Sequence, residues 1–299
     1  MTAAKTLRTL LAGNRALIAP AVFNPLSAKL AEGAGFEVLY LGGGTVGYLN
    51  CCLEANLNIT QLCQAGIDIR AVCNLPLILD GAAGFGDPMH MHHTIGMAEA
   101  AGFAAIEIED QILPKRAHHH VGIEHMVPLE LMAAKVSEAV KARRDPDFVI
   151  IARSDACREQ GYKEAVKRMR VAKDVGADMG LIFPRSHKET VNAPKDCKLP
   201  LVYVQSRGNR DQRPLYSNPQ LKDMGYAGCI DAILAIGVHF HHMRKALLEI
   251  RKTGDYTGMT KEEWITARHD IETLIGLDDH YKIERETVEK VYYAKKKRS

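Results

Sequence analysis

The chain has no apolar run long enough to cross a membrane and no pair of cysteines spaced as Cys-x-x-Cys. Glycine or charge interrupts its longest apolar stretches before they reach the ~20 residues of a membrane-spanning helix. Its 7 cysteines are an odd number, so reduced thiols are more plausible than a disulfide framework or a zinc site. Its first residues are small and polar, unlike a secretory signal. The sequence therefore predicts a cytoplasmic protein without a membrane partner.

Basic residues are scattered along the chain. The one dense basic run, Lys295–Arg298, lies at the C-terminal end of the sequence, where a solvated tail is the more common interpretation. The net charge is only +3, so we expect no nucleic-acid partner. With 299 residues, 46% of them hydrophobic, the chain is long enough to bury one large core.

Short apolar runs rich in β-formers alternate with helical patterns, which is the order of parallel strands joined by helices. Each run leads directly to polar or glycine residues that could form a site. The eight runs are Leu17–Pro20, Val38–Leu41, Leu77–Leu79, Ala105–Ile108, Val149–Ala152, Met179–Phe183, Leu201–Val204 and Gly228–Ile230. Eight such strands predict an α/β protein with a (β/α)8 TIM-type barrel, in which active sites lie at the carboxyl ends of the strands.

Additional C-terminal helices follow the eighth run. Residues Val238–Lys252 and Lys261–Ile275 are amphipathic, and Thr260 with Glu263 is typical of a capping box at the start of a helix. No linker rich in Pro, Gly or Ser separates these helices from the barrel. We therefore predict one modified barrel domain over residues 1–299, with residues 238–299 as a C-terminal helical extension.

The segment Ile106–His120 is the richest in ionisable groups. It starts within a predicted buried strand and contains three carboxylates, two cations and a histidine triplet. Carboxylates at the carboxyl end of a barrel strand, followed by a charged loop, are what an enzyme needs to hold a metal ion and cover a small anionic substrate.

Five motifs resemble, in order and spacing, those of the isocitrate lyase and phosphoenolpyruvate mutase superfamily. They are Phe36–Gly44, Asp80–Gly86, Glu109–Arg116, Ile151–Ala156 and Gly176–Met179. The resemblance implies a modified barrel that forms a homotetramer, a dimer of dimers in which the C-terminal helix is swapped onto a partner subunit. It also implies a site for small 2-oxo or 2-hydroxy carboxylates that depends on Mg²⁺, or on Mn²⁺ or another divalent metal.

The resemblance also assigns roles to single residues. Metal binding would fall to Asp80 and Glu109, and substrate binding to the glycine turn Gly42, Gly43 and Gly44. Tyr40 would touch the reacting end of the substrate, and Arg153 would clamp a carboxylate. Lys115 and Arg116 would belong to a gating loop with catalytic groups.

Departures from the family pattern affect the metal and the proton donor. The lyases carry two aspartates as Asp-x-Asp where this chain has Ala82 in the second place, and Asn56 stands near the place of a further aspartate. Losing carboxylates should weaken Mg²⁺ binding or favour another cation. Ala117 replaces the catalytic cysteine of the loop, so His118 or His119 would supply the proton. His90 with His118 or His120 could also contribute to a mixed nitrogen and oxygen metal site.

Basic residues replace polar or acidic ones further along the chain. Arg185 stands where the lyases have a glutamate, and Arg207 lies in the segment that replaces an Asn/Thr/Glu cluster. With Arg153, a substrate-binding Arg185 would favour a more anionic substrate. The alternative is that Arg185 and Arg207 face solvent.

Three hypotheses about function remain. The first is a carbon-carbon lyase that acts on a 2-methylisocitrate-like 2-hydroxy di- or tricarboxylic acid through an enolate or aci-carboxylate intermediate. The second is an oxaloacetate-type decarboxylase, or a hydrolase of a carbon-carbon or phosphorus-carbon bond, which needs no cysteine acid. The third is a non-catalytic binding protein on a degenerate barrel.

Overall fold

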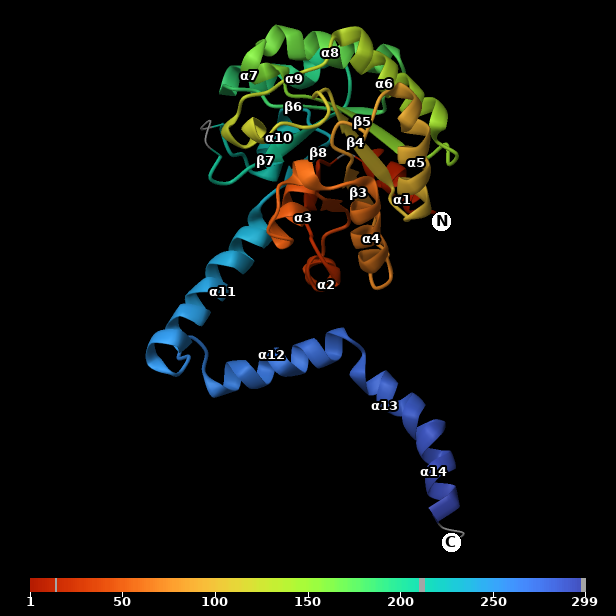
Figure 1. Ribbon diagram of the computed structural model, residues 1–299, viewed down its shortest axis with the longest axis vertical. Coiled ribbons are helices and arrows are strands. Elements are labelled where there is room, and N and C mark those ends of the chain that lie inside the picture. Colours follow the sequence, from red (N-terminus) through yellow and green to blue (C-terminus); the bar gives the residue numbers. More distant parts are fainter. Residues whose placement is uncertain (14, 210–212, 297–299) are drawn as a thin grey trace. The chain divides into compact units, whose positions relative to one another are not determined.

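The computed structural model describes residues 1–13, 15–209 and 213–296. The chain forms two units, Met1–Val238 and His239–Ser299, which we describe one at a time. Figure 1 labels the helices and strands of both. The predicted basic tail extends past residue 296, outside the described residues.

Within the described residues, the first unit contains one sheet of eight parallel strands in the order β1-β8-β7-β6-β5-β4-β3-β2. The sheet closes where Ala21 pairs with Tyr40 and the Val22 amide donates to the Tyr40 carbonyl at 2.9 Å. The strands are β1 (Leu17–Pro20), β2 (Leu39–Leu41), β3 (Leu77–Asp80), β4 (Ala105–Glu109), β5 (Val149–Ser154), β6 (Met179–Ile182), β7 (Leu201–Gln205) and β8 (Gly228–Asp231). The predicted barrel is confirmed.

Several strands run further than their apolar residues predict. β3, β4, β7 and β8 each end on a polar residue one position past the predicted end, and β5 ends at Ser154, two positions past the predicted Ala152. Backbone pairing continues regardless of side-chain polarity, as in the pairs of Glu109 with Arg153 and of Gln205 with Asp231. The polar groups at these ends are therefore held by the sheet itself.

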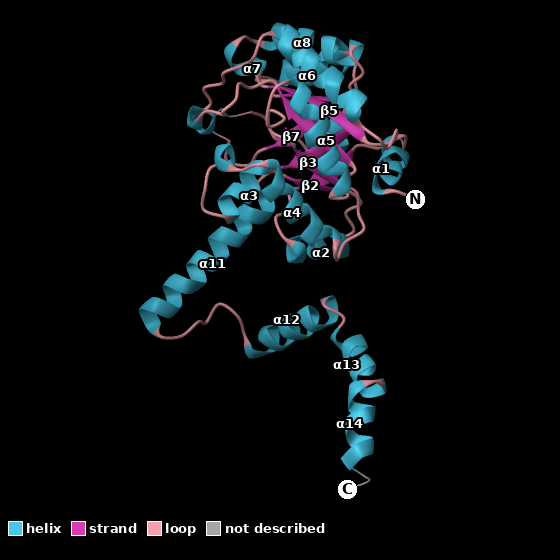
Figure 2. Ribbon diagram, turned by 45° about the vertical axis from the view of Figure 1, so that its right-hand side comes forward, coloured by secondary structure: helices cyan, strands magenta, loops and turns pink. Residues whose placement is uncertain are grey.

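Helices surround the strands of this unit, as Figure 2 shows in cyan around the magenta sheet. Asn24 and Asn58 each form a capping box that begins a helix. The helices are α1 (Ala3–Leu11), α2 (Pro25–Gly33), α3 (Gly43–Leu49), α4 (Ile59–Arg70), α5 (Met91–Ala100), α6 (Leu129–Ala142), α7 (Ala156–Glu159), α8 (Tyr162–Asp174), α9 (His187–Cys197) and α10 (Asn218–Asp223), with the short turns η1 (Glu54–Asn56), η2 (Pro88–His90) and η3 (Ala117–Val121). Apolar residues fill the barrel interior and the layer between strands and helices.

The second unit is helical. α11 (Leu234–Thr253) starts in the first unit and leads into the second, where α12 (Lys261–Leu274), α13 (Leu277–Glu286) and α14 (Val288–Lys296) follow. Thr260 and Glu263 form the predicted capping box. The sequence analysis did not foresee the last two helices. Among the described helices, none combines the length and the apolar character needed to cross a membrane.

Candidate active site

Alternation along the central strands determines which polar side chains face the inside of the barrel. Ile78, Ala105 and Val149 belong to the interior core. Because side chains alternate along a strand, residues two and four positions later point the same way. These residues are Asp80 on β3, Glu107 and Glu109 on β4, and Arg153 on β5, all of them buried. The carboxyl ends of three neighbouring strands therefore bring three acids and one guanidinium together.

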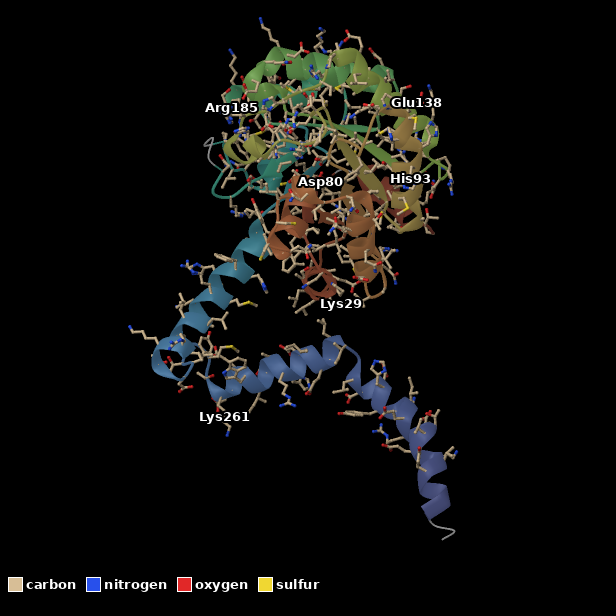
Figure 3. All side chains as sticks on the ribbon, viewed as in Figure 1. Lys29, Asp80, His93, Glu138, Arg185 and Lys261 are labelled. Carbon is tan, nitrogen blue, oxygen red and sulfur yellow. The ribbon has the colours of Figure 1, made fainter. Side chains whose placement is uncertain are left out.

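A cavity of about 580 Å³ lies at this end of the strands. Eight of the residues that the sequence analysis named line it. They are Tyr40, Gly42, Gly44, Asp80, His119, Arg153, Arg185 and Arg207. Figure 3 labels Asp80 and Arg185 on the barrel.

Asp80 is oriented by two backbone amides. Its Oδ2 accepts a hydrogen bond from the Gly43 amide at 3.1 Å, and its Oδ1 accepts one from the Ala82 amide at 3.0 Å. The Gly43 amide therefore holds Asp80 in place. A Cβ atom at Gly44 would lie 3.2 Å from Oε2 of Glu54, which is a tight contact. Glycine has no Cβ atom, so the backbone of this turn can lie close to the acid.

Glu109 lies below the cavity surface between two cations. Its Oε1 is 2.8 Å from Nζ of Lys115, and its Oε2 is 3.2 Å from an Nη atom of Arg153. Lys115 also forms an ion pair with Glu54, whose side chain is only 10% exposed. Burial alone would raise the pKa of Glu54, but Lys115, His119 and Arg153 together outweigh burial and lower it to about 2. The structure thus adds a carboxylate from η1 that the sequence analysis missed.

Tyr40 meets Glu107 inside the cavity. The Tyr40 hydroxyl donates to Oε2 of Glu107 at 3.1 Å, and Arg153 donates to Oε1 of the same carboxylate at 2.9 Å. Burial raises the pKa of Glu107 to about 8, with Arg153 opposing the shift and Asp80 adding to it. Burial likewise raises the pKa of Tyr40, so its hydroxyl keeps its proton in this state.

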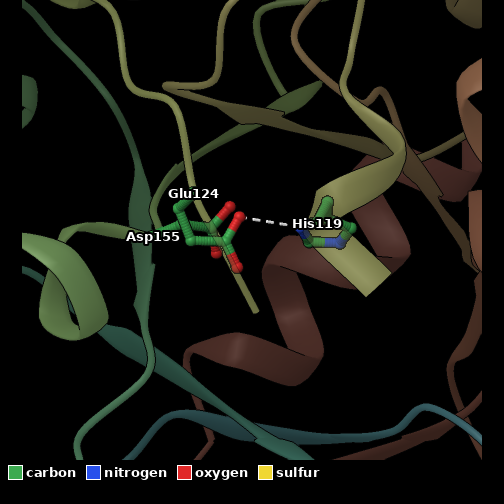
Figure 4. A group of neighbouring side chains, drawn as sticks. All are labelled: His119, Glu124 and Asp155. Carbon is green, nitrogen blue, oxygen red and sulfur yellow. Dashed lines mark hydrogen bonds and ion pairs between the residues drawn. The ribbon is translucent and has the colours of Figure 1, made fainter. Parts of the chain in front are cut away.

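His119 belongs to a second buried group, drawn in Figure 4. Its Nδ1 is 2.8 Å from Oε2 of Glu124, and the amide of Gln111 donates to Glu124 at 2.8 Å and to Asp155 at 2.6 Å. Arg158 pairs with the other oxygen of Glu124 at 3.0 Å. The ligand atoms of His119, Glu124 and Asp155 lie within 4.8 Å of one another. Gln111 donates to both carboxylates, so Glu124 and Asp155 already have hydrogen-bond partners. We therefore interpret this group as one that positions His119.

Other selected residues lie away from the cavity. Arg116 and His118 are exposed and do not line it. Asn56 is exposed as well, and Ala82 stands in a left-handed conformation with φ 45° while its amide binds Asp80. His90 caps its own turn, because its Nδ1 accepts from the Asp87 amide at 3.0 Å. The side chain of His120 lies outside the described residues.

Four site residues were missed by the sequence analysis as individual candidates. Glu107 and Asp155 could have been found by alternation, since each lies two positions from a selected residue on the same face. Glu54 and Glu124 come from loops, where no periodicity predicts which way a side chain points. The four are Glu54, Glu107, Glu124 and Asp155.

The charges around Asp80 fit a divalent cation. Among the described residues, four carboxyl groups lie around the two cations Lys115 and Arg153, so acids outnumber cations even when Glu107, with a pKa raised to about 8, keeps its proton. Neither oxygen of Glu109 accepts a well-formed hydrogen bond, although both are buried. Mg²⁺ and Mn²⁺ prefer oxygen ligands of this kind. The four carboxylates are those of Glu54, Asp80, Glu107 and Glu109.

Comparison with known proteins shows the family of the chain. The family model described as phosphoenolpyruvate phosphomutase matches residues 7–251. The 2-methylisocitrate lyase of Aeropyrum pernix is 32% identical over 288 residues, covering 95% of this chain and 91% of the relative.

Two solved structures share the fold over nearly the whole chain. The crystal structure of 2,3-dimethylmalate lyase, a member of the PEP mutase/isocitrate lyase superfamily, superposes with a TM-score of 0.85 at 29% identity and covers 96% of this chain and 95% of that one. The complex of phosphonopyruvate hydrolase with oxalate and Mg²⁺ gives a TM-score of 0.83 at 29% identity and covers 96% of this chain and 100% of that one. Sequence and fold therefore point to the same group of enzymes.

Proposed function

Because the chain belongs to the phosphoenolpyruvate phosphomutase family, whose relatives include carbon-carbon lyases, we propose that it is a divalent-metal-dependent lyase of a small 2-hydroxy di- or tricarboxylic acid. The observation that carries this proposal is the convergence of Asp80, Glu109 and Arg153 at one end of the barrel, beside a cavity of about 580 Å³. The cavity has room for a small acid, and its charges suit a carboxylate bound next to a cation.

Asp80 and Glu109 would hold the metal. When bound, a divalent cation supplies Lewis-acid stabilisation to the oxygens of the reacting carboxylate and hydroxyl. Arg153 presents its guanidinium at the cavity wall, where it can bind a carboxylate while Glu107 and Asp155 fix its orientation. Burial raises the pKa of Glu109, and Lys115, buried behind that acid, opposes the rise.

Tyr40 and His119 are placed for the two proton transfers. When Glu107 is ionised, the Tyr40 oxygen can take the proton of the substrate hydroxyl as Tyr40 passes its own proton to Glu107. The substrate C–O bond becomes the carbonyl of a 2-oxo acid, the adjacent carbon-carbon bond breaks, and its electron pair stays on the other fragment as an enolate. His119, held by Glu124, then donates a proton to the enolate carbon. Of the two loop histidines proposed as acids, His119 is the one that lines the cavity.

A decarboxylase or hydrolase is the second candidate. Ala117 cannot transfer a proton, and a 2-oxo acid that loses carbon dioxide requires no cysteine acid in the loop. Relatives in the solved structures include oxaloacetate acetylhydrolase, at 28% identity and a TM-score of 0.85. The products distinguish these reactions, since a lyase releases pyruvate or glyoxylate from a hydroxy acid whereas a decarboxylase acts on the 2-oxo acid itself.

The first experiment is metal analysis of the purified protein, followed by a turnover screen with Mg²⁺ or Mn²⁺. The substrates are 2-methylisocitrate, 2,3-dimethylmalate, oxaloacetate and phosphonopyruvate. Asp80→Asn should lose metal and reduce turnover by about a hundredfold or more, because a formal charge is removed from the site. Asp68→Asn on the exposed face of α4 is the matched control. Absence of both metal binding and turnover in the unmodified protein would favour a non-catalytic binding protein.

A homotetramer with exchanged C-terminal helices is the proposed assembly. Apolar side chains on α11 and α12, such as Phe240 and Trp264, are more than half exposed in the single chain. Exposed apolar area of this extent is typical of a surface that binds a partner.

A further inference from the structure

The charges that line the cavity are segregated around the barrel. Carboxylates come from the side of β2 to β5, as described above. The wall after β6 and β7 contributes three guanidinium groups and, among the described lining residues, no carboxylate. These are Arg185, Arg207 and Arg213. Because β7 stands four strands from β3 in a closed order of eight, the two groups of charge face each other across the cavity.

Two of these arginines are fixed by neighbours. Arg207 directs Nε and an Nη atom to Oδ2 of Asp231, each at 3.1 Å. Arg213 is 8% exposed and stacks on Phe183, with its guanidinium carbon 4.8 Å from the ring centroid. Arg153 lies over the same ring at 4.9 Å. Phe183 therefore contacts one guanidinium of the acidic side and one of the basic wall, and the stacking orients both groups in advance.

From this geometry we infer that the basic wall is a second anion subsite, which binds a carboxylate or phosphonate at the far end of the substrate. This inference rests on the proposed function, because it assumes that the reacting end binds beside Asp80 and Arg153. Guanidinium groups pair with either anion through charge-assisted hydrogen bonds. A substrate with an anion at both ends would span the cavity, whereas one with an apolar tail would place carbon against the buried Arg213 and the exposed Arg185 and Arg207.

The test compares ligands that share a reacting end and differ in the tail. Oxalate probes the reacting end alone, 2-oxoglutarate adds a terminal carboxylate, 2-oxopentanoate replaces that carboxylate with a methyl group, and 2-oxo-4-phosphonobutanoate replaces it with a phosphonate. Dissociation constants are measured by calorimetry on the full chain with Mg²⁺. We expect at least one of the two ligands with an anionic tail to bind about tenfold or more tightly than 2-oxopentanoate.

The variant Arg185→Gln, Arg207→Gln removes two charges at exposed positions, so the fold should survive. In this variant, the dissociation constants of the ligands with anionic tails and of 2-oxopentanoate should differ by no more than about twofold. The dissociation constant of oxalate should be unchanged. The control is Arg15→Gln, an exposed arginine paired with Glu37 before β1, at the opposite end of the barrel. Retention of the full preference in the double variant would overturn the inference.

The two proposals fail in different ways. If oxalate binds with Mg²⁺ but neither anionic tail improves binding in the unmodified protein, the second subsite is wrong and the proposed function stands. If oxalate and all three longer acids fail to bind, both are wrong. Preference for the carboxylate or the phosphonate tail identifies which anion the wall accepts.

Discussion

Nζ of Lys115 lies 2.8 Å from Oε1 of Glu109, and the same ammonium group also pairs with Glu54. The side chains of Lys115 and Glu109 are 3% and 0% exposed. Burial alone would lower the pKa of Lys115, but Glu109 and Glu54 outweigh burial and raise it. Lys115 therefore keeps its charge and balances two buried acids.

We predict that Lys115→Met destabilises the protein strongly. Breaking a buried ion pair by removing one partner leaves an uncompensated charge and costs about 3–5 kcal/mol in the free energy of unfolding. Urea denaturation without added metal measures this loss. The control, Lys141→Met, removes an exposed lysine that pairs with Glu138 and should cost about 0–1 kcal/mol. Equal losses in the two variants would contradict a charge-balancing role for Lys115.

The charged form of His119 should stabilise the fold at low pH. Burial alone lowers the pKa of His119, but the hydrogen bond to Glu124 and the charge of Asp155 together outweigh burial, so the net pKa is raised above its usual value. The stabilisation that charged His119 contributes to the fold is therefore complete below about pH 6.5. It disappears as the pH rises through the pKa of His119 in the folded state. The difference in unfolding free energy between the natural protein and His119→Gln should be larger at about pH 6 than at about pH 9.

The same histidine predicts a shift in the pH profile of turnover. In Glu124→Gln the hydrogen-bonded anion is lost, so the pKa of His119 falls and the alkaline limb of the profile moves to lower pH. His118→Gln is the control, because its side chain is exposed and away from the cavity. An alkaline limb that stays in place in Glu124→Gln would exclude His119 as the acid that Glu124 holds.

Gly66 on α4 should not tolerate alanine. A Cβ atom at this position would overlap the ring of Phe103, which is buried. Overpacking of this kind costs about 1–3 kcal/mol in the free energy of unfolding. At Gly33 on α2 a Cβ atom meets nothing within 4 Å, so Gly33→Ala should be neutral or stabilise by up to about 1 kcal/mol. Thermal unfolding of both variants checks the sign of each effect.

The exposed apolar stripe of α11 predicts a self-associating protein. Phe240, Met243, Leu247 and Ile250 recur at helical spacing with exposures of 65%, 50%, 61% and 47%. Light scattering should give the mass of a tetramer, and Phe240→Glu combined with Leu247→Glu should lower it.

The control for this experiment uses the other face of α11. Lys245 and Lys252 lie on the side opposite the apolar stripe, as the helical period places them. Lys245→Glu combined with Lys252→Glu introduces the same number of glutamates and should leave the mass unchanged. A monomeric natural protein would refute the assembly.

The barrel was predictable because a closed parallel sheet has a strong sequence pattern. Most of the strands are buried on both faces, so they form apolar runs that end where polar residues begin. The sequence also predicted that Asp80, Glu109 and Arg153 lie close together, because the carboxyl ends of parallel strands meet at one end of a barrel. The exact ends of strands were less predictable, because backbone pairing carries on into polar residues such as Glu109 and Gln205.

Loop residues were the least predictable part of the site. The sequence offers two adjacent loop histidines, and only the backbone of η3 determines that His119 lines the cavity while His118 is exposed. Glu54 likewise reaches Lys115 from a short turn whose direction depends on tertiary packing. The sequence analysis considered Asn56, two residues later, and thus found the region but not the side chain.

The closure of the barrel at Tyr40 has a consequence for hydrogen exchange. Among the described strands, β1 and β2 meet through one bridge, whereas each other neighbouring pair shares at least two registered pairs. The Val22 amide, which donates to the Tyr40 carbonyl, should therefore exchange with deuterium sooner than the amides of the central strands. Local opening there would also displace the Tyr40 hydroxyl, so a ligand held in the cavity should slow the exchange of Val22 from a distance.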